Sequence, residues 1–159
     1  MINRVLELLD LNKNDNVLDL FCGLGNFTLP MATLAGSVTG IKGDQPLVQH
    51  AWENARHNGI GNVEFYAADL SKDISDQSWA NRKYNKILLD PSRAGASEVL
   101  PYFKKWQPER IVYVSCNPST LARDAGILVN ELGYRLIKAG VMDMFPQTAH
   151  VESIALFEK

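Results

Sequence analysis

The chain has 159 residues, of which 46% are hydrophobic and 21% charged, and its net charge is −2. This length is sufficient for one domain with a sizeable core, and the composition excludes extensive disorder. No apolar run reaches the roughly 18 residues that a membrane span needs, and the N-terminus is too acidic for a signal peptide. We therefore expect a monomeric cytoplasmic protein with no membrane partner.

The charge and the cysteine count exclude further classes. A slightly negative chain lacks the basic footprint of extended nucleic-acid binding. Cys22 and Cys116 are too few for a disulfide framework or a four-thiolate metal site, and the histidines lack metal-ligand spacing with them. We expect no metal and, in the cytoplasm, no disulfide. One group of basic residues is interpreted first as solvated surface: Arg82, Lys83, Lys86, Lys104, Lys105 and Arg110.

Short apolar runs alternate with segments of helical period along the chain. Helices are expected over residues 2–11, 25–36, 45–59, 97–106 and 117–134. Strands are expected over residues 16–21, 37–41, 62–69, 83–90 and 110–115, with a closing pair at 134–145 and 151–159. Strands separated by helices of this length predict a mostly parallel sheet covered on both faces. Ligands of such sheets bind beyond the carboxyl ends of the strands, where "DLFCGLGNF", "GIKGD", "LLDPSR" and "VSCNPS" all fall.

The segment "DLFCGLGNF" combines a strand end with two glycines, which let a backbone approach a ligand closely. A nicotinamide-dinucleotide fingerprint would need a third glycine where Thr28 stands, so that interpretation is disfavoured. The segment resembles the first motif of S-adenosylmethionine-dependent methyltransferases. The alternative is a plain strand-to-helix turn.

The segment "LLDPSR" places Asp90 at the end of a strand, directly before a proline. Amino-group methyltransferases have a similar acid or amide, followed by two prolines and an aromatic residue, and no aromatic residue follows here. RNA cytosine-5-methyltransferases carry a cysteine in this loop, and this chain does not. Both departures count against those two classes.

Cys116 ends the next strand, and Asn117 and Pro118 then start a helix. The N-terminus of a helix carries partial positive charge and free N–H groups, which favour a thiolate. The alternative is a buried cysteine that serves only as a small apolar residue. Near the C-terminus, "DMFPQTAHVES" brings Asp143, His150 and Glu152 close together in sequence. This segment either forms a solvated hairpin or supplies a carboxylate that accepts a proton over the cleft.

Taken together, "VLDLFCGLGNFTLP", "LLDPSRAG", "VYVSCNPSTLARD" and "DMFPQTAHVES" resemble the RNA uracil-5-methyltransferase family, in the right order and from Asn16 onward. The 23S ribosomal RNA branch is the most similar, and the tRNA branch ranks second. The resemblance implies a Rossmann-like α/β fold with a seven-stranded sheet. It also implies Cys116 as the nucleophile, Glu152 as the base and Asp90 as the acid that hydrogen-bonds the uracil edge.

The resemblance further implies S-adenosylmethionine as cofactor and an RNA substrate, most similar to the 23S rRNA case. The implied cofactor contacts are Phe21, Gly23, Gly25, Asn26, Asp69 and Asp90, together with position 42. At position 42 the family has a glutamate that accepts hydrogen bonds from the ribose hydroxyls. Here the residue is Lys42, which has no acceptor, and Asp44 is the nearest acid that could compensate.

Full members of the family carry an RNA-binding β-barrel and a central domain before the catalytic one, and the 23S rRNA branch also holds an iron–sulfur cluster. We expect residues 1–159 to be a single catalytic domain without that cluster. Two alternatives remain open: a cofactor-binding module without turnover, which Lys42 favours, and a methyltransferase acting on an amino group.

Overall fold

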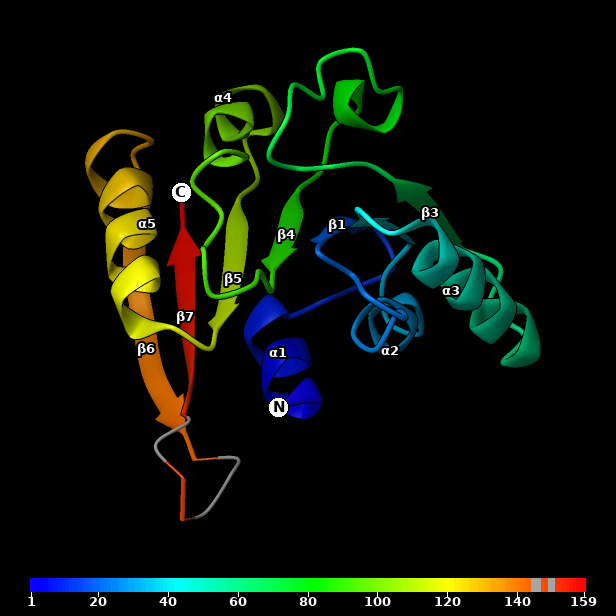
Figure 1. Cartoon of the computed structure of the whole chain (residues 1–159), viewed down its shortest axis with the longest axis horizontal. Helices are drawn as coiled ribbons and strands as arrows, with labels where there is room; N and C mark the ends of the chain where they lie inside the picture. Colours follow the sequence, from blue (N-terminus) through cyan, green and yellow to red (C-terminus); the bar gives the residue numbers. More distant parts are fainter. Residues whose placement is uncertain (144–146, 149–150) are drawn as a thin grey trace.

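The computed structural model describes residues 1–143, 147–148 and 151–159. Within these residues, seven strands form one sheet in the order β3-β2-β1-β4-β5-β7-β6 (Figure 1). The strands are β1 (Asn16–Leu20), β2 (Ser37–Lys42), β3 (Val63–Ala67), β4 (Lys86–Leu89), β5 (Arg110–Ser115), β6 (Arg135–Met142) and β7 (Glu152–Glu158). Strands β1 to β5 are parallel, whereas β7 runs antiparallel between β5 and β6. The predicted seven-stranded, mostly parallel sheet is confirmed.

Helices cover both faces of the sheet, as the sequence predicts. The helical elements are α1 (Ile2–Leu9), α2 (Thr28–Ala32), α3 (Gln45–His57), η1 (Trp79–Asn81), η2 (Leu100–Tyr102), α4 (Phe103–Trp106) and α5 (Pro118–Asn130). Helices α1, α2 and α3 pack on one face around a buried cluster, and η1, η2, α4 and α5 contribute to a second cluster on the other face. The strand β4 shows the division, because Ile87 and Leu89 belong to one cluster and Leu88 to the other.

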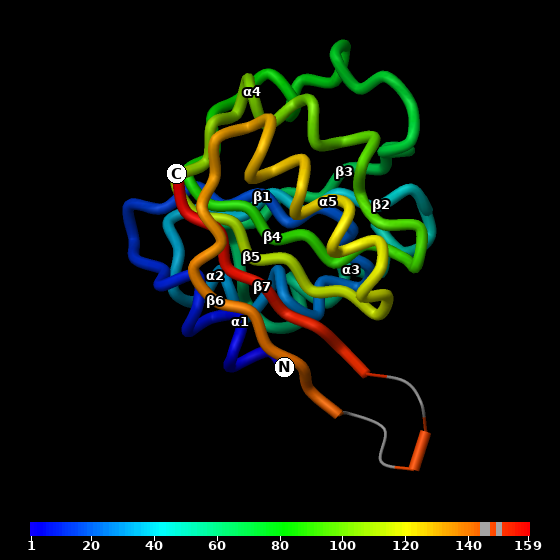
Figure 2. Tube along the Cα trace, turned by 90° about the vertical axis from the view of Figure 1, so that its left-hand side faces the viewer, coloured from blue at the N-terminus to red at the C-terminus, as the bar shows by residue number. Residues whose placement is uncertain are grey.

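The last two strands form the predicted closing pair, and they run antiparallel to each other. Figure 2 shows β6 and β7 side by side, extending past the rest of the sheet. β7 is buried on both sides, whereas β6 is an exposed edge strand. The first residue of β7 is Glu152, and because β7 runs antiparallel to β5, it starts at the edge of the sheet where β5 ends.

Several predicted helices are shorter than expected. Of the helix predicted over 25–36, only α2 is helical. It begins after the turn at Gly25, whose φ is 89°. The helix predicted over 97–106 is replaced by η2 and α4, because the imide nitrogen of Pro101 cannot donate a helical hydrogen bond. The helix predicted over 117–134 ends at Asn130. The element η1 was not predicted.

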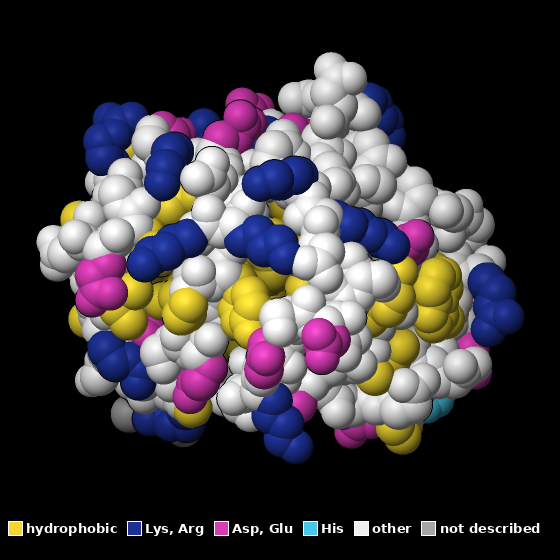
Figure 3. Space-filling view, turned by 90° about the horizontal axis from the view of Figure 1, so that it is seen from above, with side chains coloured by type: hydrophobic (Ala, Val, Ile, Leu, Met, Phe, Trp, Pro, Cys, Tyr) yellow, Lys and Arg dark blue, Asp and Glu magenta, His cyan; other side chains and the backbone are white. Residues whose placement is uncertain are grey.

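The interpretation of the basic residues as solvated surface is wrong for part of the group. Lys86 is buried and forms an ion pair with Asp15 at 2.9 Å. Arg82 pairs with Glu64, and Arg110 with Glu158 at 2.5 Å. The remaining members are exposed: Lys83, Lys104 and Lys105. Figure 3 shows Lys and Arg side chains spread over one face of the molecule, with acidic and hydrophobic side chains between them.

Membrane insertion has no support in the helices that the structure describes. Their longest members have 13 residues, and none is long and apolar enough to cross a bilayer.

Candidate active site

The carboxyl ends of the parallel strands and the start of β7 meet at one edge of the sheet, which we call the carboxyl edge. The chain leaves β1 through Phe21, at a φ of 68°, and turns at Gly23, at a φ of 58°. A Cβ atom on Gly23 would meet nothing within 4 Å, so this turn faces open space. The glycine therefore permits the left-handed turn and leaves room for a ligand beside the backbone.

One hollow at the carboxyl edge lies between the turn after β1, the end of β2 and the loops after β3 and β4. We call it the cofactor-side hollow. Three of the predicted cofactor residues line it: Phe21, Lys42 and Asp69. The structure thus brings together residues that lie far apart in the sequence.

The charged groups of the cofactor-side hollow differ in how they are engaged. Asp69 accepts hydrogen bonds from the hydroxyl of Ser71 at 2.6 Å and from its N–H at 3.0 Å, which lowers the pKa of Asp69. Asp44 caps α3 by accepting a hydrogen bond from the N–H of Leu47 at 3.3 Å. Lys42 is half-buried, and within the described part of the chain its ammonium group has no hydrogen-bond or ion-pair partner. The hollow therefore carries a free cation where the family resemblance implies an acceptor.

A second hollow, the base-side hollow, also lies at the carboxyl edge. Its lining combines Asn26, Asp90 and Glu152 with apolar residues. The apolar members are Met1, Ile2, Phe27 and Val114. Burial, together with the nearby charge of Glu152, raises the pKa of Asp90 to about 6, against the lowering effect of Lys42. Asn26, predicted as a cofactor contact, thus lies in the same hollow as the predicted substrate residue.

The pairing of β5 with β7 sets the position of Cys116 relative to Glu152. Ser115 and Ser153 are partners in this antiparallel ladder. The ladder ends at this pair, so Cys116 directly follows the last residue of β5 and Glu152 directly precedes Ser153 in β7. The predicted nucleophile and the predicted base therefore belong to the same end of neighbouring strands.

Helix α5 begins immediately behind Cys116. Asn117 caps the helix, accepting a hydrogen bond from the N–H of Ser119 at 3.1 Å. The amide of Asn117 also donates to the carbonyl of Arg93 at 3.0 Å, and the hydroxyl of Thr120 donates to the same carbonyl at 3.2 Å. These bonds tie the loop that follows Asp90 to the helix that follows Cys116, so the two predicted site segments are held together. Cys116 itself is half-buried, unlike Cys22.

Two buried carboxylates near the site were not predicted. Asp124 of α5 accepts hydrogen bonds from the N–H of Ala96 at 2.7 Å and from the hydroxyl of Tyr113 at 2.6 Å, and so holds the loop after β4. Asp19 of β1 is fully buried; one oxygen accepts from the hydroxyl of Thr28 at 2.5 Å and the other has no partner. The sequence offered a signal only for Asp19, which is the one charged residue in the apolar run of β1, whereas Asp124 directly follows Arg123.

The remaining sequence hypotheses have mixed outcomes. Cys22 and Cys116 are both free, as expected, and Cys22 is buried behind the turn after β1. Burial, helped by the charge of Asp19, raises the pKa of the Cys22 thiol, which makes it a poor thiolate. His150 lies outside the described residues, so its grouping with Asp143 and Glu152 stays a prediction. Among the described residues, no cluster of His, Cys, Asp or Glu is suited to a metal ion.

Comparison with known families identifies the chain. The model of the tRNA (uracil-5-)-methyltransferase family matches residues 1–159. The chain belongs to this family. The family resemblance that the four motifs carry is therefore confirmed.

Among curated relatives, the 23S rRNA (uracil(1939)-C(5))-methyltransferase RlmD of Methylococcus capsulatus is 66% identical over 159 residues. The protein of the same name from Francisella tularensis subsp. holarctica is 59% identical over 160 residues. In both cases the match covers 100% of this chain and 36% of the relative. The chain thus spans about a third of the length of these family members.

Solved structures support the same fold. The tRNA (uracil-54, C5)-methyltransferase of Pyrococcus abyssi, solved with S-adenosyl-L-homocysteine, matches with a TM-score of 0.79 and 30% identity, over 98% of this chain and 37% of that one. TrmN from Thermus thermophilus matches with a TM-score of 0.78 and 22% identity, over 99% of this chain and 48% of that one. The latter shows a shared fold only.

Proposed function

We propose that this chain is the catalytic domain of an S-adenosylmethionine-dependent enzyme that methylates C5 of a uridine in 23S ribosomal RNA. The observation that carries the proposal is the convergence of Cys116, Asp90 and Glu152 at the carboxyl edge of a chain that belongs to this family. Identity favours the rRNA branch, with 66% to a 23S rRNA enzyme against 30% to a tRNA enzyme. The target base must leave its RNA stack to reach such a pocket.

Cys116 opens the proposed reaction. The C5 carbon of uracil is a poor nucleophile, so the enzyme must first enrich it in electrons. The Cys116 thiolate adds to C6, an S–C6 bond forms, and the C5=C6 electron pair moves toward C5 and O4. Helix α5 begins directly after Cys116, with Asn117 as its cap.

The cofactor-side hollow is proposed to hold S-adenosylmethionine, which when bound supplies an electrophilic methyl group. The open turn at Gly23, the ring of Phe21 and the carboxylate of Asp69 suit its adenosine and methionine parts. Gly25 is proposed to keep the turn tight, and Asn26 lines the base-side hollow. Lys42 does not fit the ribose, because an ammonium group cannot accept hydrogen bonds from the two hydroxyls. The residues therefore suit the cofactor except at position 42.

Asp90 and Glu152 complete the proposed chemistry. Asp90 accepts a hydrogen bond from the N3–H of uracil and so orients the ring in the base-side hollow. After C5 has been methylated, the carboxylate of Glu152 takes the C5 proton. The C5=C6 double bond then re-forms, the S–C6 bond breaks, and the Cys116 thiolate leaves.

A trapping experiment tests this function. The chain is incubated with S-adenosylmethionine and a short RNA that carries a single 5-fluorouridine. Because fluorine at C5 cannot leave as a proton, the covalent intermediate should persist and add the mass of the RNA to the protein. We expect the adduct with the wild type and with Cys22→Ala, the matched cysteine control, and none with Cys116→Ala. Adduct formation in Cys116→Ala would contradict the assignment of the nucleophile.

The second candidate is a domain that binds the cofactor without turnover, and the free cation of Lys42 favours it. In that case calorimetry should detect S-adenosylmethionine binding while the 5-fluorouridine RNA gives no adduct. An amino-group methyltransferase would instead methylate RNA without any adduct at Cys116.

A further inference from the structure

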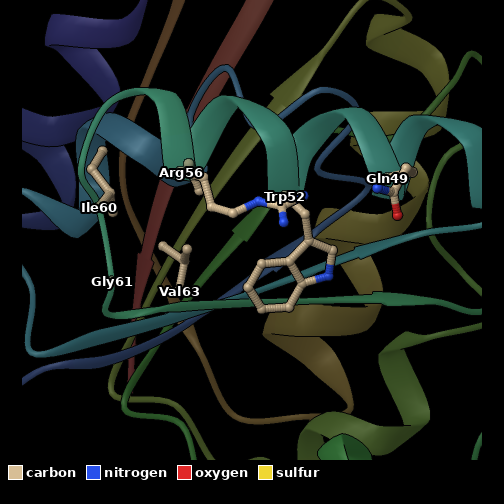
Figure 4. A pocket seen from close by; sticks show the side chains of 7 residues that line it. Gln49, Trp52, Arg56, Ile60, Gly61 and Val63 are labelled. Carbon is tan, nitrogen blue, oxygen red and sulfur yellow. The ribbon is translucent and has the colours of Figure 1, made fainter.

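A third hollow lies away from the carboxyl edge, between α3 and the start of β3. It is lined by Gln49, Trp52, Ala55 and Arg56 of α3, by Ile60 and Gly61 of the turn, and by Val63 of β3. Figure 4 shows Trp52 and Arg56 projecting from the helix over the strands, with Ile60 and Val63 at one side. We call it the tryptophan hollow. None of the roles assigned to the carboxyl edge uses it.

The indole of Trp52 is held in one orientation but is not covered. Its ring meets that of Phe65 edge to face, with centroids 5.3 Å apart and an interplanar angle of 82°. Trp52 is half-buried, in contrast to Trp79 and Trp106, which are 0% and 1% exposed. The Nε1–H of Trp52 makes no hydrogen bond with any described residue. A flat apolar surface and one donor therefore remain available to a ligand.

Arg56 gives the hollow an unpaired positive charge. It is exposed, and in the described part of the chain its guanidinium has no hydrogen-bond or ion-pair partner. The nearby acid on the same helix, Glu53, is engaged elsewhere, by Gln49 at 3.3 Å and His50 at 3.5 Å. The described lining includes no acidic side chain. A guanidinium next to an indole is suited to a ligand that combines an anion with a flat ring.

A nucleotide of single-stranded RNA combines these features. Its base has a π-face that can stack on an aromatic side chain whatever the sequence, and its phosphate pairs with arginine. The apolar floor of Ala55, Ile60 and Val63 adds contact area for a base without reading its identity. We propose that the tryptophan hollow binds one unstacked nucleotide of the RNA substrate, with the base against Trp52 and the phosphate on Arg56. This inference rests on the proposed function for the presence of an RNA substrate.

The position of the hollow separates this nucleotide from the target uridine. Strand β3 lies four steps from β5 in the sheet order. With neighbouring strands roughly 4.8 Å apart, these steps span about 19 Å. The bound nucleotide is therefore a flanking one, several positions from the base that meets Cys116, and it would add affinity without taking part in the chemistry.

Tryptophan fluorescence tests the proposal, because Trp52 is the accessible one of three tryptophans. A single-stranded uridine oligonucleotide should quench the emission of the wild type, and Trp52→Phe should abolish this response. A duplex RNA of equal length should quench far less, because its bases stay stacked. Equal quenching by both RNAs, or none by either, would overturn the proposal.

Arg56→Gln tests the phosphate contact separately. We expect about tenfold weaker binding of the oligonucleotide and a salt dependence reduced by about one phosphate contact. The matched control is Lys104→Gln, which removes an exposed positive charge on α4 and should change affinity less than twofold. Equal affinities of Arg56→Gln and wild type would remove Arg56 from the site.

The two proposals fail in different ways. If the 5-fluorouridine adduct forms but RNA does not quench Trp52, the proposed function stands and the tryptophan hollow is no RNA site. If RNA quenches Trp52 and no adduct forms at Cys116, the hollow stands and the proposed catalysis fails.

Discussion

Two buried carboxylates, one just before β1 and one inside it, differ in how fully they are paired. Asp15, just before the strand, accepts hydrogen bonds from the ammonium of Lys86 at 2.9 Å, the N–H of Asn12 at 2.7 Å and the amide of Asn85 at 2.5 Å. Asp19, inside the strand, has one partner and one unpaired oxygen. Both are buried, at 3% and 0% exposure.

The pKa values follow these surroundings. Burial raises the pKa of Asp15, but the hydrogen bonds from Lys86, Asn12 and Asn85 outweigh it, and the pKa is lowered overall. Burial, with the nearby charge of Asp90, raises the pKa of Asp19 to about 7, against the lowering effect of Thr28. The buried carboxylate at the amino end of the sheet, Asp15, is thus fully paired. Asp19, nearer the carboxyl edge, keeps one oxygen without a partner. We infer that this difference, together with the two hollows, marks the carboxyl edge as the edge that receives ligands.

The largest expected effect comes from breaking the buried ion pair of Lys86 and Asp15. Lys86→Met leaves the buried Asp15 carboxylate without its counter-charge, so we expect the free energy of unfolding to fall by about 3–5 kcal/mol. Urea unfolding followed by circular dichroism measures it. Arg82→Met is the matched control, because its pair with Glu64 is much more exposed and should be worth less than about 1 kcal/mol. Equal losses in both variants would show that burial of the pair is unimportant.

A substitution at Asp19 should instead increase the free energy of unfolding. A folded pKa of about 7, above the ordinary aspartate value of 3.8, contributes stability that is complete below about pH 4 and is lost as pH rises through 7. Asp19→Asn removes the buried charge. We expect the variant to be more stable than the wild type at pH 8, by on the order of 4 kcal/mol, and nearly equal to it at pH 4.

Urea unfolding at several pH values measures this second effect. Asp90 titrates in both proteins, and because its charge interacts with that of Asp19, the difference between them includes this coupling. A difference in stability that does not change between pH 4 and pH 8 would mean that Asp19 does not titrate in this range.

The smallest of the three expected effects is on cofactor binding, at position 42 of the carboxyl edge. Lys42→Glu restores an acceptor for the ribose hydroxyls, and hydrogen bonds to a charged partner are worth roughly 1.5–3 kcal/mol. We therefore expect S-adenosylmethionine to bind about 10- to 100-fold more tightly, as measured by calorimetry. Lys104→Glu, on exposed α4, should leave binding unchanged. Equal or weaker binding in Lys42→Glu would show that position 42 does not meet the ribose.

The fold followed from local signals that act over a few residues. Alternating and continuous apolar runs marked all seven strands, and Pro46 and Pro118 marked the starts of α3 and α5. The periodic pattern failed where a proline or a left-handed glycine cut a helix short, as at Pro101 and Gly25. Such breaks are local, but how much helix survives them depends on the packing around them.

The site was only partly visible in the sequence, because it depends on distant pairings. The ion pair of Lys86 with Asp15 joins residues 71 positions apart. The sequence shows Lys86 only as one member of a basic cluster, which predicts surface exposure. The sequence does not reveal the roles of Asp19 and Asp124, because their hydrogen-bond partners lie elsewhere in the chain. The two hollows also separate Asn26 from Phe21 and Lys42, a division that spacing along one motif could not show.

The antiparallel course of β7 has a practical consequence. Glu152 starts the strand at the carboxyl edge, and Lys159 follows its far end, which Figure 1 marks as the C-terminus. Seven residues of strand span about 24 Å. A chain tethered through its C-terminus to a sensor surface would therefore present Cys116, Asp90 and Glu152 toward the solution. Binding of RNA and cofactor can then be followed on an immobilised protein whose attachment point is remote from its chemistry.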